Sequence, residues 1–473
     1  MQDNSLPLKP LATSMVEDAM KKIEVLYDGR KAKVALDIVI VGCGLGGLAA
    51  AFCLGQAGHK ITVLESAPAI GEVGAGIQTT PNLTRLLIRW GLDAVLKEIT
   101  VEPEALAFHR WSTGERVAYT RWGDRMERDH GSPYYHIHRA DLHKILFDLA
   151  TPYMDLRLNS RVIAVDPTIP TVTLMSGEVI KTDLIVGADG IKSLVREVVV
   201  GGPDKPVPTG DAAYRAIIST ESMLKDPLLK PLVDTPEMCG WMGPDKHVMA
   251  YNIRGKKEYN IVMIHPDDGS VESWSAEGSA DTMRSYFVGW EPRVTKLLGF
   301  VKTALQWKLM DRAPLDTWVH PEGKIVLLGD ACHPMLPYRA QGSAMAIEDG
   351  AVIGNLFSRL TDRSQVPALL QAYQSLRYPR ASATQSSARL NQKIFHYHDG
   401  PEQEARDTSM KAAMLAELGQ ARLDQTEGNA NQWADKTKNF VQFSYDADLE
   451  VEKWWKEQGE KIFGGESEPT SKM

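Results

Sequence analysis

Uninterrupted hydrophobic runs and helix-like segments alternate near the start of the chain. The run Val34–Val41 leads into a glycine-rich stretch, and a segment of small and apolar residues, Gly46–Gln56, follows it. Gly58 fits the end of that helix, because glycine readily adopts the left-handed backbone that closes helices. A second apolar run, Ile61–Leu64, comes next. This order predicts a strand, a helix and a parallel strand, which together form a βαβ unit.

Two later apolar runs have the same character. Asp183–Val186 and Lys324–Leu328 each lead into a short glycine-containing turn that carries an aspartate, Asp189 in the first and Asp330 in the second. Continuous apolar runs of this length are typical of strands covered on both faces of a parallel sheet. We therefore expect both runs to join the first two strands in one sheet.

Between these two runs the pattern changes to alternating apolar and polar positions. The alternating segments are Asp211–Ser219, His247–Arg254 and Glu258–Ile264. A period of two is typical of antiparallel strands with one packed face and one solvated face. The pattern predicts a second domain, with a half-exposed antiparallel sheet, over residues 205–320.

The combined patterns predict an α/β protein with a Rossmann-like nucleotide-binding domain, a second domain built on an antiparallel sheet, and a helical C-terminal region. The expected divisions are an N-terminal extension (1–32), the first part of the nucleotide-binding domain (33–204), the antiparallel-sheet domain (205–320), the second part of the nucleotide-binding domain with helices (321–395), and a helical C-terminal tail (396–473).

The two ends of the chain carry weaker signals. Ser14–Tyr27 has the pattern of a short amphipathic helix. The polar tail is expected to wrap the surface through aromatic anchors, and residues 464–473 are expected to be disordered. The anchors are Trp433, Phe440, Trp454 and Trp455.

Charge and composition narrow the classes of function. The net charge is −8 and the pI is about 5.9, without a long basic run, which argues against nucleic acid as a partner. No apolar stretch reaches the roughly 18 residues needed to span a bilayer, and the acidic N-terminus does not resemble a secretory signal. The four cysteines lack a metal-ligand spacing, so we expect small, buried, reduced residues in a cytoplasmic protein. They are Cys43, Cys53, Cys239 and Cys332.

The first candidate binding motif is the glycine loop that follows the first strand. Gly42 allows a tight turn, Gly44 lets a pyrophosphate approach the backbone, and Gly47 lets the helix pack close to the strand. The free N–H groups at the helix N-terminus favour the negative charge of a pyrophosphate. Glu65 ends the next strand, where an acid accepts hydrogen bonds from ribose hydroxyls and disfavours a 2′-phosphate. The motif therefore predicts a dinucleotide site.

Two further motifs place an aspartate at the carboxyl end of a buried strand, where ligands of open α/β sheets bind. One contains Asp189 and Gly190, and the other runs from Gly329 to Ser343. The alternative role of each aspartate is to cap a helix N-terminus. Gly342 and Ser343 begin a predicted helix that runs to about Leu360, and its first amides would stabilise negative charge on the pyrimidine ring of a flavin.

With these motifs in this order, the chain resembles the single-component FAD-dependent aromatic hydroxylases of the para-hydroxybenzoate hydroxylase fold. It is most similar to the salicylate hydroxylase branch, especially its fungal members. The resemblance covers about residues 34–395. Besides the motifs above, it rests on Gly74-Ala75-Gly76-Ile77-Gln78, Pro81-Asn82 and His138-Arg139-Ala140-Asp141-Leu142.

The resemblance implies roles for individual residues. Glu65 and Arg139 would hold the ribose and pyrophosphate of FAD, Asp330 would contact its ribityl–pyrophosphate region, and Pro337 would turn its carbonyl to flavin and substrate. Relatives often carry Ala-Asn where this chain has Ser343-Ala344. The complete set of expected FAD-binding residues is Gly42, Gly44, Leu45, Gly47, Glu65, Ser66, Gly76, Ile77, Arg139, Val162, Asp189, Gly190, Asp330, Pro337, Gly342, Ser343 and Ala344.

The resemblance also implies a reaction. FAD, bound tightly but not covalently, would be reduced by transiently bound NAD(P)H and would react with dioxygen to give a flavin C4a-hydroperoxide. This would hydroxylate a small phenolic or hydroxybenzoate-type substrate, with or without oxidative decarboxylation. The chain has no second glycine-loop βαβ unit for a nicotinamide cofactor, as two-dinucleotide flavoproteins have. No metal is expected, because no His, Asp or Glu spacing suggests one.

Three residues of the second domain are candidates for the substrate site. Arg215 would stabilise a phenolate, although a surface salt bridge is an alternative role for it. His247 and Tyr251 lie on the same face of their predicted strand as Met249 and could line the pocket. Pro337 completes the catalytic candidates. For His333, beside the Asp330 loop, we expect a structural hydrogen bond rather than proton transfer.

Other functions remain compatible with the same sequence. One is an FAD-dependent reductase or dehydrogenase that inserts no oxygen, and another is a redox or scaffold protein that only retains FAD. The choice between NADH and NADPH, the substrate itself, and a monomer or homodimer all stay open.

Overall fold

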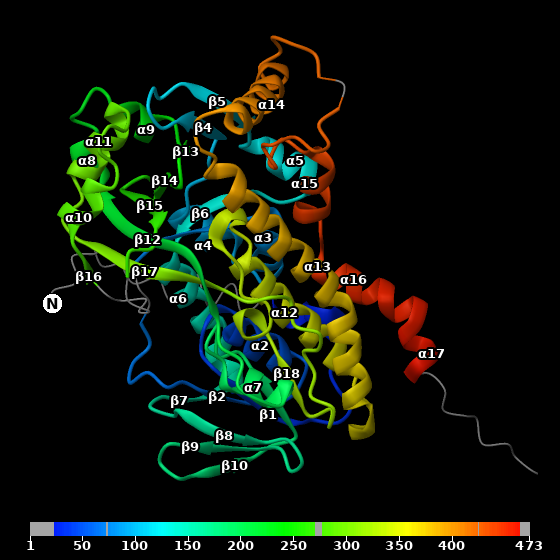
Figure 1. Ribbon diagram of the computed structural model, residues 1–473. Helices are drawn as coiled ribbons and strands as arrows, with labels where there is room; N and C mark the ends of the chain where they lie inside the picture. The colour runs from blue at the N-terminus through cyan, green and yellow to red at the C-terminus, as the bar shows by residue number, and fades with distance from the viewer. Residues whose placement is uncertain (1–22, 72–73, 270–276, 424, 464–473) are drawn as a thin grey trace, which may run out of the picture.

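The computed structural model describes residues 23–71, 74–269, 277–423 and 425–463 (Figure 1). Five parallel strands form the sheet of the nucleotide-binding half, in the order β18-β11-β1-β2-β7. Their bounds are β1 (Asp37–Val41), β2 (Lys60–Leu64), β7 (Met154–Arg157), β11 (Leu184–Gly187) and β18 (Ile325–Leu327). All four predicted apolar runs lie in this sheet, which confirms the βαβ unit.

Small residues allow the helices of this half to pack closely. Helix α2 (Leu45–Gln56) packs against both α12 (Gly342–Phe357) and α6 (Arg139–Ala150), and Figure 1 shows α2 beside α12. A Cβ on Gly350 would lie 2.7 Å from the nitrogen of Ala50. This close approach brings the N-termini of α2 and α12 to the same region.

A second sheet has eight strands in the order β16-β17-β12-β15-β14-β13-β4-β5. Its strands are β4 (Ala105–Arg110), β5 (Arg116–Arg121), β12 (Val207–Ser219), β13 (Glu237–Gly243), β14 (Lys246–Ile253), β15 (Glu258–Pro266), β16 (Glu277–Gly278) and β17 (Ala304–Asp311). The three predicted antiparallel strands are β12, β14 and β15, as expected. The sheet also takes in β4 and β5 from outside 205–320, with β4 parallel to β13. The domain boundaries themselves stay a prediction.

Both faces of this sheet are covered, so the expectation of a half-exposed sheet was wrong. One face packs with the helices α8 (Thr220–Met223), α9 (Lys230–Asp234), α10 (Ala280–Ser285) and α11 (Pro292–Gly299). The other face carries Met249 and Tyr251 and turns toward the nucleotide-binding half. The segments that cover this inner face are distant in the sequence, so the alternation of residues within a strand does not predict that the face is covered.

Other strands and helices lie along the chain between the strands of these two sheets. They are the ribbon β3 (Gly76–Thr79) and β6 (Tyr135–His138), the three-stranded sheet β8 (Val162–Asp166), β9 (Thr171–Leu174) and β10 (Val179–Lys181), and the helices α3 (Pro81–Arg89), α4 (Asp93–Ile99), α5 (Asp124–His130) and α7 (Leu194–Val200).

The C-terminal region is helical, as predicted. It contains α13 (Val366–Phe395), α14 (Pro401–Glu417), α15 (Lys436–Phe443), α16 (Ala447–Trp454) and α17 (Glu460–Phe463). Trp433 and Trp454 are buried anchors, but Phe440 is 64% exposed, so its assignment as an anchor was wrong. The predicted disorder at 464–473 and most of the helix predicted over Ser14–Tyr27 fall outside the described residues.

Two expectations from composition can be compared with the structure. All four cysteines are buried and none forms a disulfide. Within the described ranges, no helix has the length and apolar character that crossing a membrane requires.

Candidate flavin and substrate site

Close contacts hold the glycine loop between β1 and α2 in place. Gly42 has a φ of +107°, and a Cβ there would lie 2.4 Å from the carbonyl oxygen of Ala188. A Cβ on Gly47 would lie 2.1 Å from the carbonyl oxygen of Gly42. Gly44 differs, since no heavy atom lies within 4 Å of its Cβ position. The loop is therefore rigid on its protein side and open at Gly44.

Two long helices begin at this region without a capping side chain. Gly44 precedes α2, which starts at the buried Leu45, and Gln341 precedes α12; neither makes a side-chain cap hydrogen bond. The first amides of such helices lack intrahelical acceptors and favour an anionic group. Gly342 and Ser343 are partly accessible at the start of α12, whereas Ala344 is buried.

Glu65 ties the glycine loop to the end of β2. Its Oε2 accepts a hydrogen bond from Cys43 N at 3.0 Å, and its Oε1 accepts from Ala67 N at 2.8 Å and from Ser66 Oγ at 3.2 Å. Ser160 N–H donates to the Glu65 carbonyl, which brings β8, starting at Val162, to the same place. The proposed ribose site is thus assembled from three segments.

Arg139 reaches the region from the ribbon β3–β6. Its N–H donates to Ala75 O at 2.7 Å, and Gly76 and Ile77 lie in β3, paired with β6. Burial lowers the pKa of the Arg139 guanidinium, while nearby Asp330 partly restores it. The structure therefore brings together two charged residues that the sequence separates widely.

The carboxylate of Asp189 accepts hydrogen bonds from residues a few positions later in the chain. Its Oδ1 accepts from Ser193 Oγ at 2.5 Å, and its Oδ2 accepts from Leu194 N at 2.8 Å and from Val195 N at 3.2 Å. The carboxylate thus performs the helix-capping role considered as the alternative, for α7. Gly190, with φ of +75° and open space at its Cβ position, is the part of this motif that a ligand can approach.

Two residues of the loop after β18, Asp330 and Pro337, are exposed between buried neighbours. Asp330 is accessible between buried Gly329 and Ala331, and burial nevertheless raises the pKa of its carboxyl. A carboxyl that is both accessible and desolvated faces a space enclosed by protein. Pro337 is likewise exposed between buried neighbours, and its carbonyl accepts from Ala340 N at 3.1 Å. One side of this loop therefore lines the enclosed space.

These features fit FAD. The open backbone at Gly44 and the uncapped N-terminus of α2 match a pyrophosphate, the carboxylate of Glu65 lies beside the loop, and the uncapped N-terminus of α12 matches the pyrimidine end of the isoalloxazine.

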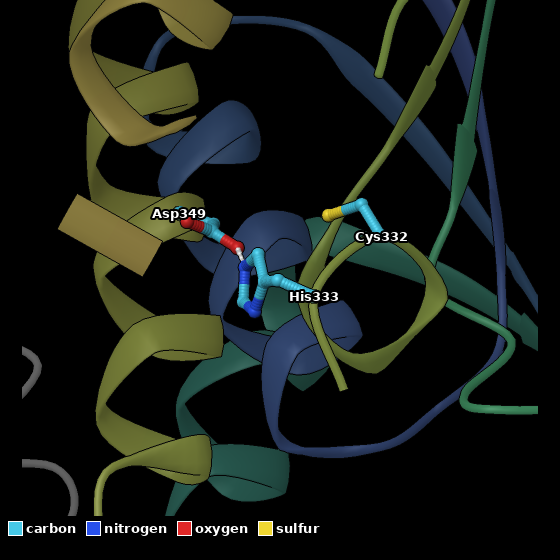
Figure 2. Close-up of side chains that lie close together, drawn as sticks. All are labelled: Cys332, His333 and Asp349. Atoms are coloured by element: carbon cyan, nitrogen blue, oxygen red, sulfur yellow. Dashed lines mark hydrogen bonds and ion pairs between the residues drawn. The ribbon is translucent and has the colours of Figure 1, made fainter. Parts of the chain in front are cut away.

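A buried ion pair lies behind the loop. Figure 2 shows the imidazole of His333 directed at Asp349 on α12, with Nε2 2.6 Å from Oδ2. The same Oδ2 accepts from Gly329 N at 3.0 Å, next to Asp330. Cys332, His333 and Asp349 are the one group of possible metal ligands within the described ranges. Because both Asp349 oxygens already have partners, the structural role expected for His333 fits the geometry.

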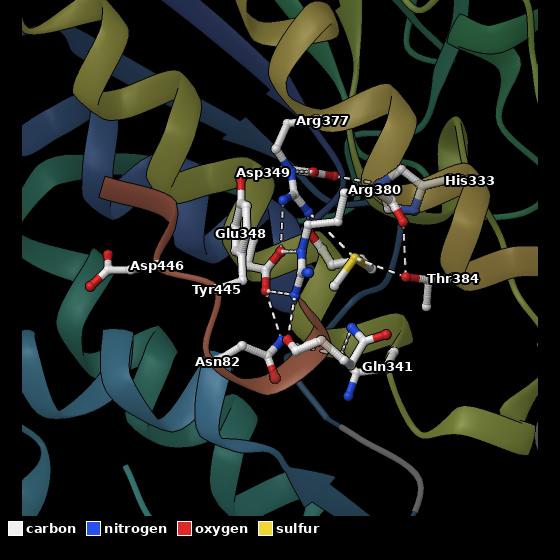
Figure 3. Close-up of polar contacts among 12 residues, drawn as sticks. Asn82, His333, Gln341, Glu348, Asp349, Arg377, Arg380, Thr384, Tyr445 and Asp446 are labelled. Atoms are coloured by element: carbon white, nitrogen blue, oxygen red, sulfur yellow. Dashed lines mark hydrogen bonds and ion pairs between the residues drawn. The ribbon is translucent and has the colours of Figure 1, made fainter. Parts of the chain in front are cut away.

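A larger charge network continues from Asp349 (Figure 3). Arg377 donates to Asp349 Oδ1 at 2.7 Å and to Glu348 Oε2 at 2.6 Å. Arg380, one turn along α13, donates to both oxygens of Glu348. Its guanidinium also lies 3.9 Å from the centre of the Tyr445 ring. Sequence reasoning missed this network; the available signal was an acidic pair on one helix and two arginines three residues apart on the next.

We predict a pH dependence of stability from the ion pair. Burial opposes a charged imidazole, but Cys332 and Asp349 raise the pKa of His333 well above its usual value. When the pKa of a histidine is higher in the folded than in the unfolded protein, its charged form stabilises the fold. This contribution is complete below the unfolded-state pKa of about 6.5 and is lost as the pH rises toward the folded-state pKa. Urea unfolding from pH 6 to pH 9 should therefore show a shrinking difference between the wild type and His333→Gln.

The exposed His398 supplies the control for this measurement, because its surface pair with Asp245 contributes little and His398→Gln should stay close to the wild type in stability. A His333→Gln difference that grows with pH would show that the imidazole is neutral in the folded protein.

Arg215 and Tyr251 meet on the inner face of the eight-stranded sheet. The Arg215 guanidinium lies 4.6 Å from the centre of the Trp307 ring, and its Nε has no hydrogen-bond partner among the described residues. This position differs from the surface salt bridge that was the alternative. Burial lowers the pKa of Arg215 to about 10, so it is charged at neutral pH. Burial raises the pKa of Tyr251 to about 12, and Gln78 and Arg215 oppose that rise.

His247 lies on the same face but contacts a different group. Its Nδ1 is 2.8 Å from His396 Nε2, and its ring packs against Tyr338 with 5.2 Å between centroids. Tyr338 directly follows Pro337. The substrate candidates therefore form two clusters, Arg215 with Tyr251 and His247 with Tyr338.

Known proteins resemble this chain over most of its length. The protein family described as the FAD binding domain matches residues 35–388. The FAD-dependent monooxygenase OpS4 of Beauveria bassiana is 37% identical over 419 residues, which is 87% of this chain and 95% of that protein. The 3-amino-4-hydroxybenzoate 2-monooxygenase PtmB3 of Streptomyces platensis is 36% identical over 380 residues, 80% of this chain and 92% of that protein. A solved salicylate hydroxylase substrate complex superposes with a TM-score of 0.71 at 24% identity, covering 89% of this chain and 98% of the other.

Proposed function

The chain belongs to the FAD-dependent aromatic monooxygenases, and on that premise we propose that it uses NAD(P)H and dioxygen to hydroxylate a small phenolic or hydroxybenzoate-type compound. The observation that carries the substrate class is Arg215, a desolvated cation on the inner face of the sheet that pairs with no carboxylate among the described residues. A relative of similar length is named for action on an aminohydroxybenzoate, which is an anionic phenol.

Bound FAD would supply the redox chemistry, namely hydride uptake from NAD(P)H and transfer of one oxygen atom of dioxygen to the aromatic ring. The protein's own contribution is to position the substrate and to favour its anionic form. Arg215 favours an anionic phenolate or carboxylate oxygen, because a cation in a desolvated site attracts negative charge strongly. Tyr251 keeps its proton at neutral pH and can donate a hydrogen bond to the same oxygen. An ionised phenol is a better nucleophile toward an electrophilic oxygen.

The flavin end is positioned by the loop after β18. The first amides of α12 favour negative charge on the pyrimidine ring, and Pro337 contributes an exposed wall between flavin and substrate. FAD is proposed to bind tightly without a covalent bond, and NAD(P)H only transiently, in a cytoplasmic monomer or homodimer without a resident metal.

Oxygen consumption tests the proposal directly. Purified protein should be yellow, and its oxidation of NADH or NADPH should accelerate on addition of salicylate, 3-hydroxybenzoate or 3-amino-4-hydroxybenzoate, with matching oxygen uptake and a hydroxylated product. Release of carbon dioxide would identify decarboxylation. Substrate reduction without oxygen uptake would instead identify a reductase, and phenol-independent oxidation that yields only hydrogen peroxide would refute hydroxylation.

A further inference from the structure

A pair of buried histidines joins β14 to the end of α13. His247 is buried, the His396 side chain is 11% exposed, and the two ring nitrogens that face each other lie 2.8 Å apart. In such a bond one nitrogen donates and the other accepts. A proton can therefore pass from one ring to the other while both rings stay in place.

Asp211, on β12, lies on the outer side of this pair. Its Oδ2 accepts hydrogen bonds from Tyr338 Oη at 2.8 Å and from Gln392 Nε2 at 2.7 Å, which fix the carboxylate. The same oxygen lies 3.9 Å from His396 Nδ1. At this distance the carboxylate faces the ring without a direct hydrogen bond, and its negative charge favours a proton on His396.

The outer end of this chain of groups opens to solvent. Asp211, Gln392 and His396 lie in the wall of a surface cleft of about 330 Å³. The other lining residues are Arg389, Lys393, Tyr397, His398 and Glu402. Water therefore has access to the end that carries Asp211 and His396.

The inner end lies on the sheet face that also carries the proposed substrate residues Arg215 and Tyr251. His247 shares its strand face with Met249 and Tyr251, and its ring packs against Tyr338, the neighbour of Pro337. The chain of polar groups thus runs from the cleft to the face that carries Arg215.

We propose that His396 relays protons between the surface cleft and the substrate site, through His247 on the inner side and Asp211 on the outer side. The proposal rests on the proposed function, whose balance is one aromatic C–H, dioxygen, NAD(P)H and one proton giving C–OH, NAD(P)⁺ and water. Each turnover therefore takes up at least one proton from solution. His396 is a positioning residue in this scheme, because it acts through His247.

The surrounding charges are consistent with a relay. His396 faces Asp211 from β12, Asp245 from the turn before β14, and His247 from β14, while Arg389, Lys393 and Glu402 line the cleft. Burial lowers the pKa of both histidines, and the two aspartates partly restore that of His396. Two rings that are neutral at pH 7 can each take up a proton and release it. Burial and Asp211 raise the pKa of Tyr338 well above 10, so its hydroxyl remains a donor that holds Asp211.

Chemical rescue in the FAD-loaded enzyme tests the relay. His396→Ala should lower kcat by about 100-fold or more, since proton transfer by a positioned side chain typically contributes about 10²- to 10⁴-fold. Imidazole added to the assay should enter the space of the removed ring and restore most of the rate, in proportion to its unprotonated concentration. The substrate is whichever compound of the phenol panel the wild type hydroxylates.

His398→Ala is the matched control, because His398 lines the same cleft but pairs with Asp245 at 2.8 Å. Its rate should match the wild type with and without imidazole. FAD content and melting temperature report on folding, and if His396→Ala does not fold, Asp211→Asn should displace the pH profile of kcat instead.

Unaltered turnover in His396→Ala, or a loss that imidazole does not reverse in a folded variant, would overturn the relay while leaving the hydroxylase assignment intact. Absence of hydroxylation by the wild type itself would refute the proposed function, and the relay with it.

Discussion

Replacing Arg377 with alanine should lower the free energy of unfolding by about 3–5 kcal/mol, the cost of leaving buried charges unpaired. Arg377, Glu348 and Asp349 are all 0% exposed. Without the guanidinium, Asp349 keeps His333 and Gly329 N, and Glu348 keeps Arg380 and Asn82. Urea unfolding followed by tryptophan fluorescence measures the change.

Arg363→Ala supplies the control, because Arg363 pairs with Asp183 at the surface and is 52% exposed. Exposed ion pairs contribute little to the free energy of unfolding, so the unfolding midpoint of Arg363→Ala should stay close to that of the wild type. Equal losses in the two variants would show that burial of the Arg377 network does not determine its contribution. Arg377→Met, which restores volume without charge, should remain strongly destabilised for the same reason.

The second large effect is expected on catalysis. Arg215→Ala should retain FAD and lower kcat/KM for the phenolic substrate by about 10²- to 10³-fold, the usual loss when one preorganised charge or donor is removed. Asp330→Ala should behave in the opposite way and lose the flavin, because Asp330 lines the enclosed space beside Arg139. Flavin absorbance and steady-state oxygen uptake separate the two outcomes.

Arg116 offers a matched control on the same sheet. It also lies over an aromatic ring, with 5.1 Å to the Tyr119 centroid, but it is 42% exposed and pairs with Glu237. Arg116→Ala should keep both flavin and turnover. A folded but colourless Arg215→Ala protein would contradict the assignment of Arg215 to the substrate.

Features that depend on local sequence were predicted well. The glycine loop follows from a positive φ at Gly42 and from contacts within one βαβ unit, both of which leave a pattern in consecutive residues. The strands β1, β2, β11 and β18 were predicted because burial on both faces demands uninterrupted apolar residues.

Features that depend on residues far apart in the sequence were not predicted. Strands β4 and β5 join a sheet whose other strands begin more than eighty residues later. The second covered face of that sheet and the burial of the Arg377 network have the same origin, since the spacing of the charged residues shows candidate partners but not that the two helices pack together and bury them. Asp189 shows the converse, because its hydrogen bonds are local and a motif alone does not separate capping from ligand binding.

The contact of Arg380 with the C-terminal segment bears on the order of assembly during synthesis. Arg380 donates to the carbonyls of Val441 and Gln442 as well as to Glu348, and Gln442 donates to Gln341 immediately before α12. A ribosome-bound chain that has not yet released Val441 lacks these partners, although every glycine of the first βαβ unit has long been available. The contacts that support the flavin loop are therefore completed late in synthesis, only after the chain has emerged through Gln442.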